Sequence, residues 1–99
     1  PDAPFDTIFD TCIAHNIPYH CSNWREYEAF NLKEMHDKIT QGEIQFGWLY
    51  LPSLDGTLHA YGTQDEKVAQ KILWLDKEIK SIYHHALKHY DEVSLYVFS

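Results

Sequence analysis

The feature that most constrains the fold is a long apolar stripe at helical spacing in the second half of the chain. Its members recur every three or four residues and are Val68, Ile72, Leu75, Ile79, Ile82, Ala86 and Tyr90. Thr63 and Glu66 form a capping-box pattern, so the predicted helix begins there and ends near Tyr90. At 1.5 Å per residue such a helix spans roughly 40 Å. Because its stripe must be buried, the chain needs a second layer against it.

A short helix is predicted near the N-terminus. Asp2 is its expected N-cap, and Pro4 suits its first turn. Asn16 fits the left-handed position that ends a helix. The apolar stripe of this helix consists of Phe5, Ile8, Phe9, Cys12 and Ile13.

A second helical stretch is expected over residues 23–41, and Gly42 ends it. Glu28 and Asn31 lie on the same side as its apolar residues, which admits two explanations. Asn31 with Glu34 matches a capping box, so the stretch would be two short helices with a break after Asn31. Otherwise a carboxylate and an amide lie on a core face, which would be a candidate polar site. The break, or an edge position for these polar residues, is the favoured interpretation.

Three strands complete the predicted elements. Ile44–Leu51 and Thr57–Thr63 flank Pro52–Gly56. Asp55-Gly56 is a strong tight-turn signal, so the pattern predicts a β-hairpin. Glu92–Phe98 alternates between two apolar faces and is the predicted last strand.

We therefore expect an α+β fold with the element order α-α-β-β-α-β, in one domain that covers residues 1–99. The sheet is three-stranded and mainly antiparallel, in the order 3-1-2, with the first hairpin strand in the centre. The long helix covers one face of this sheet. The N-terminal helices or a dimer partner cover the other.

Aromatic side chains gather on the expected sheet face opposite the long helix, namely Phe46, Trp48, Tyr50, Tyr61, Tyr96 and Phe98. Such a face exceeds the apolar area that a soluble monomer usually exposes. Three explanations of what covers this aromatic face are possible. The N-terminal helices fold over it, which is favoured, or a second copy of the chain does so across a two-fold axis. The third possibility is a cleft that receives a ligand or a partner protein.

The candidate residues for binding a ligand or partner are Trp48, Tyr50, His59, Tyr61, Tyr96, Glu28 and Trp74. An imidazole, phenols and a carboxylate on one face suffice for general acid–base chemistry. An ordinary packed core explains them too, and it is favoured, so no catalytic residue is assigned. Trp74 lies opposite the apolar stripe, which is typical of an interface anchor or of a side chain half covered by a loop.

His85 and His89 lie one helical turn apart on a face shared with Glu78. At this spacing two imidazoles can chelate a divalent ion. Two histidines on a solvated helix face arise easily in a chain that has seven. They are weak metal candidates, and the sequence predicts neither a metal nor another cofactor.

Charge limits the classes of partner. Eight Lys and Arg against fifteen Asp and Glu give a net charge of −7, which disfavours nucleic acid and anionic membranes. No apolar run approaches the ~18–20 residues of a membrane span, and the opening residues lack the pattern of a secretory signal. We therefore expect a cytoplasmic protein.

Familiar catalytic patterns are missing from the sequence, including a Gly-rich phosphate loop, CxxC, HExxH and a nucleophile elbow. The predicted function is a small acidic, non-enzymatic protein-interaction module of the inhibitor, immunity or adaptor type. Its partner would be another protein or a second copy of the chain. The alternative is a homodimeric protein or enzyme that binds a small apolar or aromatic ligand in a pocket on the sheet face.

Overall fold

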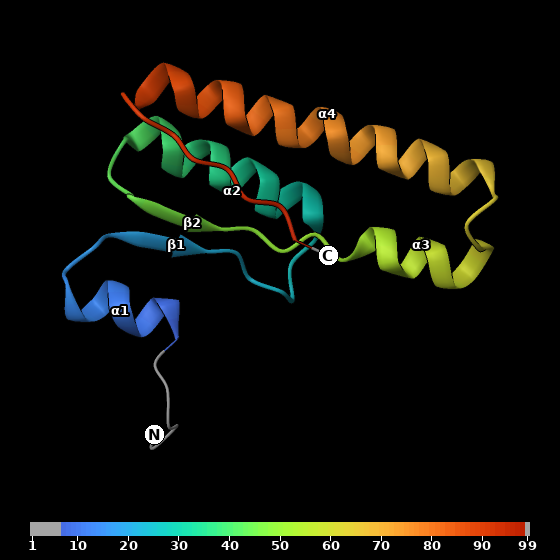
Figure 1. The fold of residues 1–99 in the computed structure, drawn as a ribbon, viewed down its shortest axis with the longest axis horizontal. Helices are drawn as coiled ribbons and strands as arrows, with labels where there is room; N and C mark the ends of the chain where they lie inside the picture. The colour runs from blue at the N-terminus through green and yellow to red at the C-terminus, as the bar shows by residue number, and fades with distance from the viewer. Residues whose placement is uncertain (1–6, 99) are drawn as a thin grey trace.

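Helices dominate the computed structural model, which describes residues 7–98 (Figure 1). The elements in order are α1 (Ile8–Ala14), β1 (Tyr19–Cys21), α2 (Glu28–Gln41), β2 (Phe46–Trp48), α3 (Ser53–Tyr61) and α4 (Glu66–His89). Residues 90–98 follow α4 as an irregular segment, which we call the C-terminal segment. It runs back across α2, and Tyr90 and Val93 of this segment pack against the core (Figure 1).

Helix α1 begins at a reciprocal cap. The Thr7 hydroxyl accepts a hydrogen bond from Asp10 N–H at 3.2 Å, and the Asp10 carboxylate accepts one from Thr7 N–H at 2.9 Å. Asn16 has a φ of 55° after the helix, which confirms the predicted left-handed residue. The predicted start at Asp2 and Pro4 lies outside the described residues.

Helix α2 runs without a break from Glu28 to Gln41, so the predicted break after Asn31 is wrong. Asn31 does not cap a helix, because its side-chain amide donates to the backbone carbonyl of Asn23 at 2.9 Å. This bond ties the loop before α2 to the buried side of the helix. Gly42 ends α2 with a φ of 69°, as predicted.

The only sheet within residues 7–98 is a pair of short parallel strands. Tyr19 of β1 pairs with Phe46 of β2, and Cys21 pairs with Trp48. The predicted three-stranded antiparallel sheet in the order 3-1-2 is therefore wrong, and so is the element order. The C-terminal segment joins no ladder among the described residues, although it was predicted as a strand. The coarser prediction of a small single domain with both helices and strands is confirmed.

Residues 53–61 form helix α3 where a turn and a strand were predicted, so the β-hairpin is wrong. Leu54, Thr57 and Leu58 are half-buried and recur at helical spacing, and α3 packs against α4. The Thr57 hydroxyl donates to the Ser53 carbonyl at 2.8 Å, a contact that a helical turn makes possible. Packing on a neighbouring helix thus overrides the local turn preference of Asp55-Gly56.

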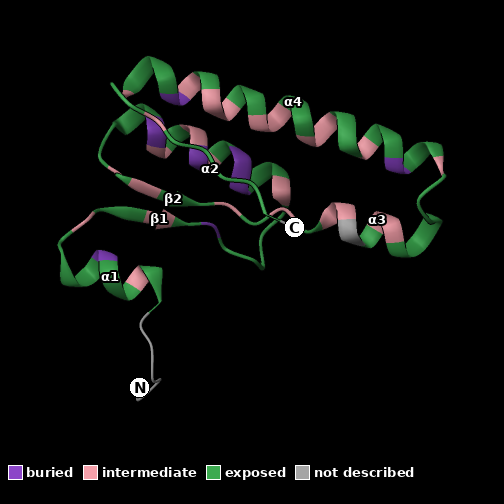
Figure 2. Ribbon diagram, viewed as in Figure 1, coloured by how far each residue is buried: buried purple, intermediate pink, exposed green. Residues whose placement is uncertain are grey.

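Helix α4 confirms the predicted long helix, but its cap is Asp65 rather than Thr63. The Asp65 carboxylate accepts a hydrogen bond from Lys67 N–H at 2.7 Å. The core lies between α2 and α4, and Figure 2 shows that buried residues concentrate along α2. Its buried members are Met35, Ile39 and Ala86, joined by Ile44, Leu49, Ile82, Tyr90 and Val93. Within residues 7–98, no helix combines the length and apolar character needed to cross a membrane.

Candidate functional site

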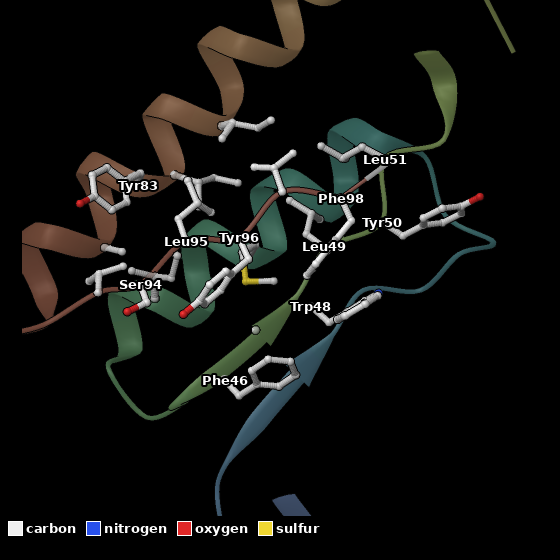
Figure 3. Close-up of a pocket in the computed structure, with 18 of the residues that line it drawn as sticks. Phe46, Trp48, Leu49, Tyr50, Leu51, Tyr83, Ser94, Leu95, Tyr96 and Phe98 are labelled. Carbon is white, nitrogen blue, oxygen red and sulfur yellow. The ribbon is translucent and has the colours of Figure 1, made fainter. Parts of the chain in front are cut away.

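A wide apolar groove of about 1230 Å³ opens between the helices, strand β2 and the C-terminal segment (Figure 3). Met35 and Ile39 line it from α2, and Leu75 and Ile79 line it from α4. The other wall carries aromatic rings from two parts of the chain, namely Phe46 and Trp48 of β2, Tyr50, and Tyr96 and Phe98 of the C-terminal segment. The groove is therefore shaped for an apolar or aromatic group.

The charge of the groove also favours an apolar or aromatic group. Apart from tyrosines, Glu92 is the one ionisable residue among the described residues that line it, and no Lys, Arg or His joins it there. An anionic group is stabilised by cationic or hydrogen-bond-donating groups. The groove interior is thus suited to the uncharged part of a ligand.

The aromatic wall is braced by helix α1. The Phe9 ring lies 6.1 Å from the ring of Phe46 and 6.1 Å from that of Trp48, where it stands edge-on. Trp48 in turn stacks against Phe98 at 6.2 Å. Trp48 remains 39% exposed and Tyr96 75% exposed. Helix α1 therefore packs on the rings of β2 and leaves ring surface open to the groove, but the three-stranded sheet face that the N-terminal helices were expected to cover does not form.

A polar cluster joins three helices at one end of the groove, and we call it the Glu28–Ser53–Lys71 cluster. Ser53 N–H donates to the Glu28 carboxylate at 2.7 Å, and the Ser53 hydroxyl donates to it as well. Lys71 Nζ lies 3.1 Å from Glu28 Oε1. Pro52, at the start of α3, supplies no side-chain cap, so a carboxylate from α2 caps α3 instead.

The cluster lies close to the groove along the chain. Pro52 and Leu54 flank Ser53, and both line the groove. Leu75 follows Lys71 by one turn of α4 and also lines it. The backbone N–H and hydroxyl of Ser53 and the ammonium of Lys71 are thus the donors gathered at this end.

The Glu28 carboxylate is ionised at neutral pH. Burial by itself raises the pKa of Glu28, but the hydrogen bonds from Ser53 and the charge of Lys71 together hold that pKa below its ordinary value of 4.5. The ammonium of Lys71 also lies 3.9 Å from the centre of the Trp74 ring. Trp74 is therefore half-buried beside a cation.

Five of the seven residues predicted from the sequence belong to the groove or to its polar end. Trp48, Tyr50 and Tyr96 line the groove, and Tyr50 N–H donates to the Ser22 hydroxyl at 3.0 Å. Glu28 and Trp74 belong to the polar end. His59 and Tyr61 lie on α3, and neither is among the described residues that line the groove.

Tyr61 instead packs its ring under Lys67 Nζ at 4.4 Å. The structure therefore does not assemble the predicted group of His59, Tyr50, Tyr61 and Glu28 on one sheet face. The reason is that residues 53–61 form a helix, so the strand that was to carry His59 and Tyr61 on the sheet face does not exist.

A third imidazole lies beside His85 and His89, the two weak candidates for metal binding. The rings of His85 and His89 lie 4.7 Å apart, and His36 of α2 lies 4.9 Å from His85. Among the described residues, no group of three or more His, Cys, Asp or Glu side chains is arranged to hold a metal ion.

Sequence reasoning missed Ser53 and Lys71. Pro52-Ser53 was the available signal, because proline is favoured at the start of a helix and serine follows it here. The pattern was assigned to a turn because Asp55-Gly56 follows. No signal marks Lys71, whose contact with Glu28 spans 43 positions of the chain.

No curated protein and no solved structure matches this chain. The sequence profile for type I phosphodiesterase / nucleotide pyrophosphatase matches residues 3–99. Because that family is named for enzymes, the prediction of a non-enzymatic interaction module is wrong. The match extends over nearly all of the chain, so the protein belongs to the type I phosphodiesterase / nucleotide pyrophosphatase family.

Proposed function

We propose that the protein acts in the hydrolysis of phosphodiester or pyrophosphate bonds of nucleotides. The family match over residues 3–99 is the observation that carries this proposal. In such a reaction water adds to phosphorus, one P–O bond breaks, and the leaving oxygen takes up a proton. The protein must therefore hold the uncharged part of the substrate, receive its phosphate and exchange a proton.

The aromatic wall of the groove is the proposed site for the base. Trp48, Tyr50 and Tyr96 offer ring surface on which a flat heterocycle can stack, and stacking on aromatic side chains is a common way to hold a base. The absence of Lys, Arg and His from the described groove lining supports placing the phosphate elsewhere.

The phosphate is assigned to the Glu28–Ser53–Lys71 cluster. An ammonium, a hydroxyl and a backbone N–H are the donors that phosphate oxygens accept from. These donors now bind the Glu28 carboxylate, so a substrate phosphate would share Lys71 and Ser53 with Glu28 or replace it.

His59 is the proposed proton-exchanging residue. It lies in the last turn of α3, the helix that begins with Ser53, and it is exposed to solvent. Imidazole is the side chain used most often for general acid–base catalysis.

A hydrolysis assay on the full chain tests the proposal. The substrate is the p-nitrophenyl ester of thymidine 5′-monophosphate, assayed with and without added divalent cations, because many phosphoryl-transfer reactions need them. We expect release of p-nitrophenol well above the rate in buffer. No release in either condition would overturn the proposed function.

Two variants test the assigned residues. Lys71→Met keeps the side-chain length over Trp74 but removes the charge, and we expect kcat/KM to fall by about 10–100-fold. His59→Ala should lower kcat by about 100-fold or more. The matched controls are Lys80→Met and His84→Ala on the exposed face of α4, which should keep the original rate. Equal losses in variant and control would contradict the assignment, provided far-UV circular dichroism shows all four folded.

A further inference from the structure

Three imidazoles form a row across the contact between α2 and α4. The ring of His36 on α2 lies 4.9 Å from that of His85 on α4, and the ring of His89 lies 4.7 Å beyond His85. His36 and His85 are half-buried, and His89 is exposed. Ala86, next to His85, is buried against Met35 and Ile39 of α2. The row therefore lies at the edge of the core that holds the two helices together.

Hydrogen bonds fix the proton on His85. The Thr40 hydroxyl donates to the His36 carbonyl at 3.0 Å, so its oxygen is left to accept. His85 Nε2 lies 2.8 Å from that oxygen and 3.2 Å from the same His36 carbonyl, which only accepts. With both oxygens accepting, these contacts assign the ring N–H of His85 to Nε2.

The charges that face the row come from both helices. His85 and Glu78 face His36 from α4, and Asp37 faces it from α2. The segment after α4 adds Tyr90, which packs against the same core. Burial and the neighbouring His85 lower the pKa of His36, while Glu78 and Asp37 raise it, and the net effect places the pKa below its ordinary value of 6.5. Protonation of His36 is thus opposed by its burial and by the neighbouring His85.

We propose that the His36–His85–His89 row is an acid-sensitive latch between α2 and the last turns of α4. When the row is neutral its rings pack, and when it takes up protons the rings repel one another. Tyr90 and Val93 follow directly after α4 and line the apolar groove, so release of this end loosens one wall of the groove. The inference depends on the fold and does not require the proposed hydrolytic activity.

The sign of the pH effect follows from His36. Below pH 6.5 the unfolded chain binds a proton at this residue that the folded chain resists. The contribution of the latch to stability is therefore complete above 6.5 and is lost as the pH falls through the lowered value.

Urea unfolding at pH 7.5 and pH 5.5 tests the latch. We expect the midpoint of the original protein to fall by a few tenths of a molar at the lower pH. In His36→Gln, which cannot take up the proton, less than half of this fall should remain. His84→Gln, on the exposed face of the same helix, should keep all of it. An equal fall in His36→Gln and the original protein would overturn the proposal.

Two measurements on the unmodified chain keep the test decisive if the variant does not fold. NMR titration of the histidine ring protons should give His36 a half-protonation point below pH 6.5, and a value at or above 6.5 would overturn the latch. Hydrogen exchange, corrected for its intrinsic pH dependence, should show lost protection in the last turn of α4 at pH 5.5 while the middle of α2 keeps its protection. Uniform loss over both helices would also contradict a local latch.

Discussion

Glu28 is the residue at which three helices meet. It lies at the start of α2, caps the first turn of α3 through Ser53 and binds the ammonium of Lys71 on α4. Its side chain is only 13% exposed, and that of Lys71 22%, so both charges lie largely out of water. Removing one member leaves the others without a partner, which is costly for a buried charge.

Glu28→Gln should therefore destabilise the fold. The neutral amide keeps the size of the side chain but loses the charge-assisted hydrogen bonds, so we expect the free energy of unfolding to fall by about 1–3 kcal/mol in urea denaturation at pH 7. Asp76→Asn is the matched control, because its ion pair with Lys80 is exposed. That change should cost no more than about 0.5 kcal/mol. Equal losses in the two variants would contradict the role of Glu28.

Acid should affect the same residue. The pKa of Glu28 is lowered in the folded chain, so the unfolded chain takes up a proton first as the pH falls. The contribution of Glu28 to stability is complete above pH 4.5 and lost below it as the pH passes the lowered value. Unfolding curves between pH 6 and 3 should show a smaller pH dependence in Glu28→Gln than in the original protein. Identical slopes would argue against an ionised Glu28.

At the level of single residues, the sequence indicated part of the Glu28–Ser53–Lys71 cluster. The helical pattern put Glu28 and Asn31 on an apolar side, which raised the possibility of a polar site there. The break was favoured instead because Asn31 and Glu34 match a local cap. The true partner of Asn31 is the Asn23 carbonyl, and the partners of Glu28 come from α3 and α4. Local spacing carries no information about such contacts.

Among the elements, α3 shows most clearly how packing overrides a local signal. Asp55-Gly56 predicts a tight turn, yet it lies inside a helix whose half-buried side chains meet α4. By contrast, α4, the end of α2 at Gly42 and the left-handed Asn16 were predicted, because each depends on periodicity or on a residue that its backbone conformation requires. Strands depend on distant partners, which is why the C-terminal segment was misassigned.

Two glycine substitutions distinguish the helix from the turn. A Cβ at Gly56 would meet nothing within 4 Å, and alanine is the better helix former. Gly56→Ala should therefore stabilise the protein by about 0.5–1 kcal/mol in thermal or urea unfolding. In a hairpin turn the same change would be destabilising, and that result would contradict α3.

Gly42→Ala should have the opposite sign. A Cβ there also meets nothing within 4 Å, but the residue has a φ of 69°. The left-handed conformation costs alanine about 1 kcal/mol, so the protein should be destabilised by roughly that amount. Because neither site is crowded, the two changes differ only in backbone conformation. The same sign for both would show that the cap or the helix is misassigned.

For the whole molecule, charge sets the pH dependence of solubility. The net charge is −7 with neutral histidines, and protonating all seven brings it to 0. The isoelectric point is about 5.3. The polyethylene glycol concentration that precipitates the protein should therefore fall between about pH 6.5 and pH 5. Constant solubility over that range would contradict this balance of charges.

The groove was anticipated only in outline. Five of the six aromatic residues that the sequence grouped together line it, but so do their chain neighbours Leu49, Leu51, Leu95 and Val97, so the predicted alternation does not explain the lining. Its other wall comes from α2 and α4, and its polar end comes from Glu28, Ser53 and Lys71. These parts meet only through the packing of three helices, which no pattern within one segment specifies.

The most direct test of the account is where a nucleotide binds. Isotope-labelled protein titrated with α,β-methylene-ADP, which resists hydrolysis, reports on each site by NMR. We predict chemical-shift changes at the indole N–H of Trp48 and the backbone N–H of Ser53, with little change at His84 on the exposed face of α4. Saturating analogue that leaves both Trp48 and Ser53 unshifted would contradict the assignment of base to groove and phosphate to cluster.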